Sequence, residues 1–229
     1  MAEAPQTSEI TLESIALESI GGWPELISSL LDRRDLDAAH ARAAMTNILS
    51  GSATPAQLIG FVVALRAKGE TPEELSGLLD AVLEAATLVP LDEATRERAI
   101  DIVGTGGDRS HSINVSTMSA IVVAGAGVPV CKHGARAASS QCGTADVLEA
   151  LGVAVELSPE GVKQCVERAG MGFCLAARYH PAFRFAAPSR REIGVPTVFN
   201  LLGPMANPGR VKRQLIGVAN PLVAERMLA

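Results

Sequence analysis

The chain has 229 residues, of which 48% are hydrophobic and 20% are charged. A chain of this size and composition can bury a substantial core, so a disordered protein is excluded. The longest apolar run, Ala120–Val130, is interrupted by glycines and is about half the ~20 residues that a membrane helix requires. We therefore expect no membrane association. The N-terminus lacks a basic segment followed by an apolar stretch, so we expect no secretory signal and a cytoplasmic location.

The net charge of −5 is unevenly distributed. Residues 1–100 contain 7 basic and 16 acidic side chains, whereas residues 101–229 contain 13 basic and 9 acidic ones. A phosphate ligand is therefore expected in the second part. Only seven side chains are aromatic, which argues against a base-stacking nucleic-acid surface. The cysteines and histidines lack the spacing of a structural zinc site.

The first hundred residues show helical patterns. Thr54-Pro55-Ala56-Gln57 and Thr71-Pro72-Glu73-Glu74 each place Thr at the N-cap, Pro at the first helical position and Gln or Glu three residues after the cap. Apolar residues then recur at helical spacing. Two more helices are expected over Pro24–Leu31 and Ala38–Leu49. These patterns predict a small helical domain over residues 21–95, preceded by a flexible N-terminus over residues 1–20.

After an expected hinge at Pro90–Ala99, short β-branched runs alternate with helical segments. The expected strands are Ile100–Val103, Val128–Cys131, Ala154–Leu157, Phe173–Ala176 and Gln214–Val218. The expected helices are Ser116–Ala124, Ala145–Leu151, Pro159–Ala169, a segment near Arg184–Glu192, and one starting near Pro221. This alternation predicts an α/β domain with a mainly parallel sheet over residues 96–229.

A glycine-rich segment, Gly104-Thr105-Gly106-Gly107-Asp108, follows the first expected strand directly. Glycines let backbone N–H groups approach a phosphate closely, although an ordinary tight turn would need them too. The segment is neither a Rossmann fingerprint nor a Walker A loop. Asp108 beside a phosphate requires a cation or a sugar hydroxyl between them.

Two further segments extend this possible phosphate site. Ser112-Ile113-Asn114-Val115-Ser116-Thr117 opens an expected helix with hydroxyls and an amide, which either cap the helix or bind phosphate and Mg²⁺. Lys132-His133-Gly134 ends an expected strand, at the edge of the sheet where α/β proteins bind ligands. Arg136, Ser139 and Ser140 follow at once, and the group together favours an anion site over solvated charges.

In order along the chain, these motifs resemble the anthranilate phosphoribosyltransferase family. The resemblance is carried by Gly104–Asp108, Asn114–Thr117, Lys132–Ser140, Asp146–Gly152, Arg190–Gly194 and Phe199–Pro204. It implies a nucleoside phosphorylase/phosphoribosyltransferase-like fold and transfer of phosphoribose from phosphoribosyl pyrophosphate to anthranilate, in tryptophan biosynthesis. It also implies Mg²⁺ as cofactor and a homodimer.

The resemblance implies roles for individual residues. The phosphoribosyl pyrophosphate contacts would be Gly104, Gly107, Asp108, Ser112, Asn114, Val115, Ser116, Thr117, Lys132, His133, Gly134, Ala135, Arg136, Ala137, Ala138, Ser139, Ser140 and Thr144. The anthranilate contacts would be Gly104, Ala135 and Arg190, and Ser116 would bind the metal. Such a reaction needs leaving-group stabilisation and alignment more than a strong base. His133 is the one weak candidate for a base, and a structural hydrogen bond is the alternative.

Two departures from the family change these expectations. Ala135 stands where the family has asparagine in Lys-His-Gly-Asn-Arg, so weaker or altered acceptor binding is expected. The chain stops at Ala229, before the family's Asp-Glu pair for a second Mg²⁺, so we expect an unpaired sheet edge, an exposed apolar surface and little activity of this chain alone. The alternatives are a nucleoside phosphorylase-like enzyme and a truncated, non-catalytic donor-binding paralogue.

Overall fold

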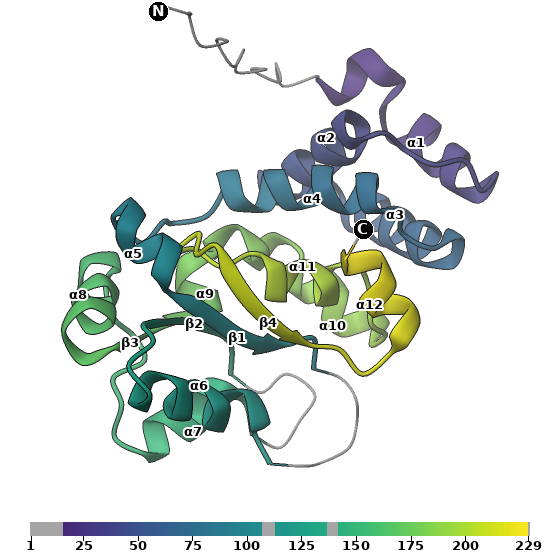
Figure 1. Ribbon diagram of the computed structural model, residues 1–229. Coiled ribbons are helices and arrows are strands. Elements are labelled where there is room, and N and C mark those ends of the chain that lie inside the picture. The colour runs from purple at the N-terminus through teal and green to yellow at the C-terminus, as the bar shows by residue number, and fades with distance from the viewer. Residues whose placement is uncertain (1–15, 107–112, 137–141, 229) are drawn as a thin grey trace, which may run out of the picture.

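The computed structural model describes residues 16–106, 113–136 and 142–228 (Figure 1). The N-terminal part contains the 3₁₀ helix η1 (Leu17–Ile20) and the helices α1 (Gly22–Leu31), α2 (Ala38–Leu49), α3 (Pro55–Lys68) and α4 (Pro72–Glu84). The second part contains α5 (Glu93–Arg98), β1 (Ile100–Gly104), α6 (Val115–Gly125), β2 (Val130–Gly134), α7 (Thr144–Ala150), α8 (Pro159–Ala169), β3 (Met171–Leu175), α9 (Ala176–Tyr179), η2 (Pro181–Phe185), α10 (Ala187–Ile193), α11 (Phe199–Met205), β4 (Arg213–Gly217) and α12 (Pro221–Leu228). None of the described helices is long and apolar enough to cross a membrane.

Helices α1–α4 form a bundle in which α1 packs on α3 and α2 on α4. Both predicted capping boxes are confirmed. Thr54 Oγ1 accepts a hydrogen bond from the Gln57 backbone N–H at 3.3 Å, and Gln57 Oε1 accepts one from the Thr54 N–H at 2.9 Å. Thr71 and Glu74 make the same pair of bonds at 3.2 and 2.8 Å. Both helices therefore begin where the sequence predicts, because two otherwise unpaired backbone donors are satisfied at each start.

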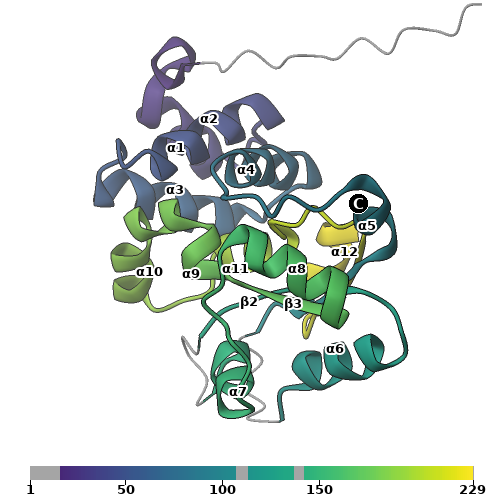
Figure 2. The same cartoon turned by 90° about the vertical axis from the view of Figure 1, so that its left-hand side faces the viewer.

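The hydrophobic core of the bundle continues into the second part of the chain. Buried residues of α1–α4 share one cluster with the later residues Ala186, Val198, Phe199, Leu201, Leu202, Ala206 and Val223. Helices α10, α11 and α12 therefore pack against the bundle, as both views show (Figures 1 and 2). This packing fixes the bundle against the helices that lie next to the sheet.

The four described strands form one parallel sheet in the order β3-β2-β1-β4. Helices α6 and α7 cover one face, and α8, α9 and α11 lie on the other, toward the bundle (Figures 1 and 2). Because β1 and β2 are parallel neighbours, the segments that follow them leave from the same edge of the sheet. The predicted fold class, α/β with a helical N-terminal part and a parallel sheet, is confirmed.

The strand predicted at Ala154–Leu157 is wrong, because this segment is a loop. Only Val155 is buried there, and the side chain of Glu156 turns outward to Arg136, at 3.2 Å from Oε1 to Nη2. The segment pairs with no strand of the described sheet. A β-branched run becomes a strand only when a neighbouring ladder accepts it. Helix α5 lies in the segment expected to be a hinge, and Asp92 caps it by accepting a hydrogen bond from the Thr95 N–H at 2.6 Å. The short helices α9 and α11 had no such signal, and α11 even contains Pro204.

The expected free edge of the sheet is β4, which pairs only with β1 among the described strands. Leu215 on β4 is 57% exposed. On the same side of the sheet, helix α6 also shows apolar side chains to solvent, among them Val115, Met118 and Val122. The described structure thus has an open edge at β4 and apolar side chains of α6 that face solvent.

Candidate anion-binding site

The site is built at the carboxyl ends of β1 and β2, which end at Gly104 and Gly134. Gly106, two residues beyond β1, has φ +64°, a left-handed conformation that favours glycine. Across the edge, a Cβ on Gly134 would lie 2.9 Å from Phe173 Cε2 and 3.1 Å from Thr144 Cβ. Gly134 therefore lets the start of α7, at Thr144, approach the end of β2.

The N-terminus of α6 adds a second element to this edge. Asn114 is its N-cap, and Oδ1 accepts hydrogen bonds from the Thr117 backbone N–H at 3.2 Å and from Thr117 Oγ1 at 2.8 Å. Ser116 Oγ donates to the same oxygen at 3.3 Å. The capping role that the sequence allowed is therefore present. The N–H groups of Val115 and Thr117 donate to Ile113 O and Asn114 Oδ1, so the first turn offers an anion the Ser116 N–H and the positive dipole end of the helix.

Lys132 places a buried positive charge between β1 and α6. Its Nζ donates to the carbonyl oxygen of Ile102 and to Ser116 Oγ, the latter at 3.3 Å. The side chain is fully buried, and this burial lowers the pKa of Lys132 to about 8. The ammonium therefore lies directly behind the hydroxyl at the helix N-terminus, where it can stabilise an anion bound to that hydroxyl.

Asp101 is a buried carboxylate that sequence reasoning did not single out. Its Oδ1 accepts a hydrogen bond from the backbone N–H of His133 at 3.0 Å, and its Oδ2 has no partner among the described residues. Burial raises the pKa of Asp101 to about 6. The only sign of this carboxylate in the sequence was an acidic residue inside a short apolar strand, a position at which an acid is normally paired.

His133 follows Lys132 and is itself buried. Its Nδ1 lies 3.0 Å from the carbonyl oxygen of Gly203. A carbonyl can only accept, so Nδ1 carries the proton and Nε2 presents a lone pair, which has no partner in the described structure. Burial lowers the pKa of His133 to about 3. His133 therefore makes the structural hydrogen bond that was the alternative to a catalytic role. Because its pKa is so low, the ring is poorly suited to remove a proton.

A row of rings leads from His133 to Arg190. The ring centroids of His133 and His180 are 5.1 Å apart, and His180 stacks on Phe183 at 5.3 Å. Phe183 meets the edge of Phe199 at 5.6 Å, and the Arg190 guanidinium carbon lies 4.7 Å from the Phe199 centroid. Sequence reasoning missed His180, Phe183 and the role of Phe199, because only the fold brings three separate segments into this row.

Arg190, on α10, is half-buried and has no carboxylate within ion-pair distance in the described part of the chain. Burial lowers the pKa of this guanidinium, which nevertheless stays charged at neutral pH. An unpaired, partly desolvated arginine against an aromatic ring suits a planar carboxylate ligand. The arrangement thus offers an anion site at the strand ends and, at the guanidinium of Arg190, a second cation that suits a carboxylate.

Several predicted site residues cannot be placed. Gly107, Asp108, Ser112, Ala137, Ala138, Ser139 and Ser140 lie outside the described residues. The structure brings together Gly104, Asn114, Val115, Ser116, Thr117, Lys132, His133, Gly134 and Thr144 at or beside the two strand ends. Ala135 is exposed, and its carbonyl accepts a hydrogen bond from the Ala145 N–H at 3.2 Å. Arg136 turns away to α7, where Glu149 binds its guanidinium through both oxygens.

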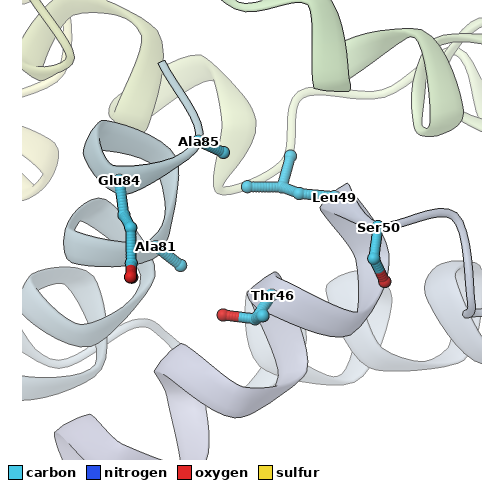
Figure 3. Close-up of a pocket in the computed structure, with 6 residues that line it drawn as sticks. All are labelled: Thr46, Leu49, Ser50, Ala81, Glu84 and Ala85. Atoms are coloured by element: carbon cyan, nitrogen blue, oxygen red, sulfur yellow. The ribbon is translucent and has the colours of Figure 1, made fainter. Parts of the chain in front are cut away.

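A pocket of about 230 Å³ lies elsewhere, between α2 and α4 (Figure 3). Its walls are Thr46, Leu49, Ser50, Ala81, Glu84 and Ala85. The one charged wall residue is Glu84, which already pairs with Arg42 at 2.6 Å. This pocket offers no cation, so it does not suit a phosphate ligand.

Comparison with known proteins agrees with this fold. Residues 24–86 match the helical bundle domain of the glycosyl transferase family, and residues 96–229 match its α/β domain. The chain therefore belongs to this glycosyl transferase family.

Within the family, the chain is similar to anthranilate phosphoribosyltransferases, as the motifs implied. It is 56% identical to that of Salinispora arenicola over 207 residues, 90% of this chain and 59% of the relative, and 58% identical to that of Saccharopolyspora erythraea, over 90% and 58%. The structure of the Thermus thermophilus enzyme superposes with a TM-score of 0.82 at 42% identity, covering 88% of this chain and 60% of that one. The Saccharomyces cerevisiae enzyme in complex with PRPP and Mg gives 0.80 at 29% identity, covering 89% and 60%. The chain thus spans about three fifths of the length of these relatives.

Proposed function

We propose that the chain transfers the phosphoribosyl group from phosphoribosyl pyrophosphate to anthranilate, giving N-(5-phosphoribosyl)anthranilate and pyrophosphate in tryptophan biosynthesis. The observation that carries this proposal is the row of rings between Lys132-His133 and the unpaired Arg190. It joins an anion site to a site for an aromatic carboxylate. The similar proteins from Salinispora and Saccharopolyspora are anthranilate phosphoribosyltransferases, which supports the same activity here.

The donor would bind at the strand ends. Backbone N–H groups after β1 and that of Ser116 at the start of α6 would contact its phosphates, together with the Ser116 hydroxyl. Lys132 would stabilise the negative charge that develops on the departing pyrophosphate, because its ammonium lies 3.3 Å from Ser116 Oγ in a buried position. Because this charge is already in place, pyrophosphate can leave without a general acid or base.

Mg²⁺ fits this site through one protein ligand. Ser116 Oγ is an oxygen donor at the helix N-terminus, and no group of three or more metal-ligating side chains occurs among the described residues. Mg²⁺ commonly binds through one or two protein oxygens, with substrate phosphates and water filling the other positions. When bound, the ion would neutralise pyrophosphate charge. The similar yeast enzyme forms a complex with PRPP and Mg, which supports this assignment.

The acceptor would bind with its carboxylate on Arg190, at the end of the ring row. Its neutral amine would attack the anomeric carbon, so that a C–N bond forms as the C–O bond to pyrophosphate breaks, and the amine proton passes to solvent or to pyrophosphate. His133 stays neutral, since its pKa is lowered to about 3, and it would orient the acceptor without removing a proton. Ala135 adds no side-chain hydrogen bond to this ligand.

In the cell we propose a cytoplasmic homodimer. The support is the resemblance to the named biosynthetic enzymes. Sedimentation of the purified chain would test the dimer: a mass near twice 23.8 kDa is expected, and a mass of 23.8 kDa would refute it.

The transfer can be tested with two matched arginine variants. We expect Arg190→Gln to raise the anthranilate KM about tenfold or more and to leave the Kd for phosphoribosyl pyrophosphate with Mg²⁺ unchanged, because a charged contact to the acceptor is lost. Arg191→Gln is the control, since Arg191 is exposed on the same helix. Donor binding by calorimetry without turnover would indicate a binding module instead. Phosphorolysis of thymidine would indicate a nucleoside phosphorylase.

A further inference from the structure

The loop that joins β2 to α7 is closed at its neck by three pairs of residues. Gly134 lies against Thr144, where a Cβ on the glycine would come within 3.1 Å of Thr144 Cβ. The Ala135 carbonyl accepts a hydrogen bond from the Ala145 N–H at 3.2 Å. Arg136 then reaches Glu149 on α7. Residues 134–136, which leave β2, therefore lie beside the first residues of α7.

Arg136 makes the most extensive contacts of this neck. Its Nη1 and Nη2 donate to the two carboxylate oxygens of Glu149, the Nη2 bond being 2.9 Å long. Nη2 also donates to Glu156 Oε1 at 3.2 Å, and Nη1 lies 3.6 Å from Asp146 Oδ1. Asp146 in turn accepts from the Gly143 N–H at 2.7 Å, at the returning end of the loop. The Arg136 guanidinium thus contacts three carboxylates, those of Asp146, Glu149 and Glu156.

These contacts bear on the charge available to a phosphate. The bidentate bond to Glu149 is the strongest of them: it raises the pKa of Arg136 and lowers the pKa of Glu149. To reach a phosphate, the guanidinium would have to break its bonds to Glu149 and Glu156 and leave both carboxylates near an incoming anion. Lys132, in contrast, already points to the helix N-terminus and has no carboxylate within ion-pair distance in the described structure.

We propose that Arg136 is a positioning residue, which holds the neck of the β2–α7 loop through Glu149 and Glu156 and does not contact the donor's phosphates. Its effect on donor binding, which rests on the proposed function, passes through the placement of Gly134, Ala135 and Thr144. Removing the arginine or its main carboxylate partner should then have the same consequence, because both changes open the same neck.

The test compares Arg136→Gln, Glu149→Gln and the double variant, with Glu167→Gln as control. Glu167 is exposed on α8 and forms no ion pair among the described residues. The first measurement is amide hydrogen exchange of peptides that cover residues 142–148, which needs no ligand. We expect exchange to be several-fold faster in both single variants, no faster again in the double variant, and unchanged in the control. Unchanged exchange in Glu149→Gln would overturn the proposal.

The second measurement is calorimetric titration with phosphoribosyl pyrophosphate and Mg²⁺. We expect each single variant and the double variant to weaken binding by a similar factor, about three- to tenfold, which is the non-additive result for one coupled pair. If Arg136 contacted phosphate directly, Glu149→Gln would leave binding unchanged or tighten it while Arg136→Gln weakened it, and this outcome would overturn the proposal. If exchange responds as expected but the unaltered chain binds no donor, the proposed function fails and the positioning role stands.

Discussion

Glu70 and Arg226 form an ion pair across 156 positions of the chain, with 2.8 Å between Glu70 Oε2 and Arg226 Nη1. The Glu70 side chain is fully buried at the turn between α3 and α4, and Arg66 Nη1 lies 3.4 Å from the same oxygen. Gly69, with φ +96°, precedes it, and a Cβ there would lie 3.1 Å from Arg226 Nη2. The pair therefore joins α12 to the helical bundle at a place where glycine makes room for the guanidinium.

Replacing Arg226 by methionine should destabilise the fold. The change leaves the buried Glu70 carboxylate with only the longer contact to Arg66, and we expect the free energy of unfolding to fall by about 1–3 kcal/mol. Adding Glu70→Gln should restore part of that loss, since no buried charge then remains. Urea unfolding measures both. Arg42→Met is the matched control: its partner Glu84 is 64% exposed, so a loss below about 1 kcal/mol is expected. An equal loss in the two arginine variants would contradict the argument.

Gly134→Ala should lower stability and distort the end of β2. The new Cβ would lie 2.9 Å from Phe173 Cε2, closer than side chains normally approach, so the ring or the strand must shift. We expect a cost of about 1–3 kcal/mol in thermal or urea unfolding. Gly125→Ala is the control, because nothing lies within 4 Å of its Cβ position in α6 and the change should be neutral or slightly stabilising. The prediction fails if both variants unfold alike.

The pH dependence of stability should contain a contribution from His180. Its Nε2 donates to the Ala206 carbonyl at 2.8 Å, and burial lowers its pKa from 6.5 to about 4. Between pH 6.5 and 4 the unfolded chain binds a proton that the folded chain does not, so stability falls as the pH falls, by about 1.4 kcal/mol per unit for this group. His180→Gln keeps a donor and removes the titration. Its unfolding free energy should therefore fall less steeply between pH 6.5 and 4.5; an unaltered slope would show that the pKa of His180 is not lowered in the folded chain.

Ala135→Asn should strengthen acceptor binding if the proposed function holds. The asparagine amide would supply a hydrogen bond that Ala135 cannot make, worth about 0.5–1.5 kcal/mol. We expect the anthranilate KM to fall about two- to tenfold with little change in the donor Kd. Because Ala135 is exposed, the larger side chain needs no repacking. Steady-state kinetics at saturating donor measures the anthranilate KM, and an unchanged value would refute the prediction.

Local patterns were sufficient for the elements whose ends are stabilised by their own residues. The helices that begin at Pro55, Pro72 and Pro159 start where predicted, because the cap and the proline that define each start are adjacent in the chain. The strand that ends in Lys132-His133-Gly134 was recognised from its motif, although its start is two residues later than predicted. The loop at Ala154–Leu157 was misjudged, because a β-branched run carries no information about whether a neighbouring strand will pair with it.

The sequence by itself determined the class of the fold, the uneven charge and the order of the phosphate motifs, all of which depend on residues close together in the chain. Only the tertiary structure decided the rest. It placed Asp101 against the His133 backbone, committed Arg136 to Glu149, and aligned His180, Phe183 and Phe199 between His133 and Arg190. These contacts join segments that are distant in sequence, and whether a buried charge is paired or left for a ligand depends on which of them the folded chain brings within hydrogen-bond distance.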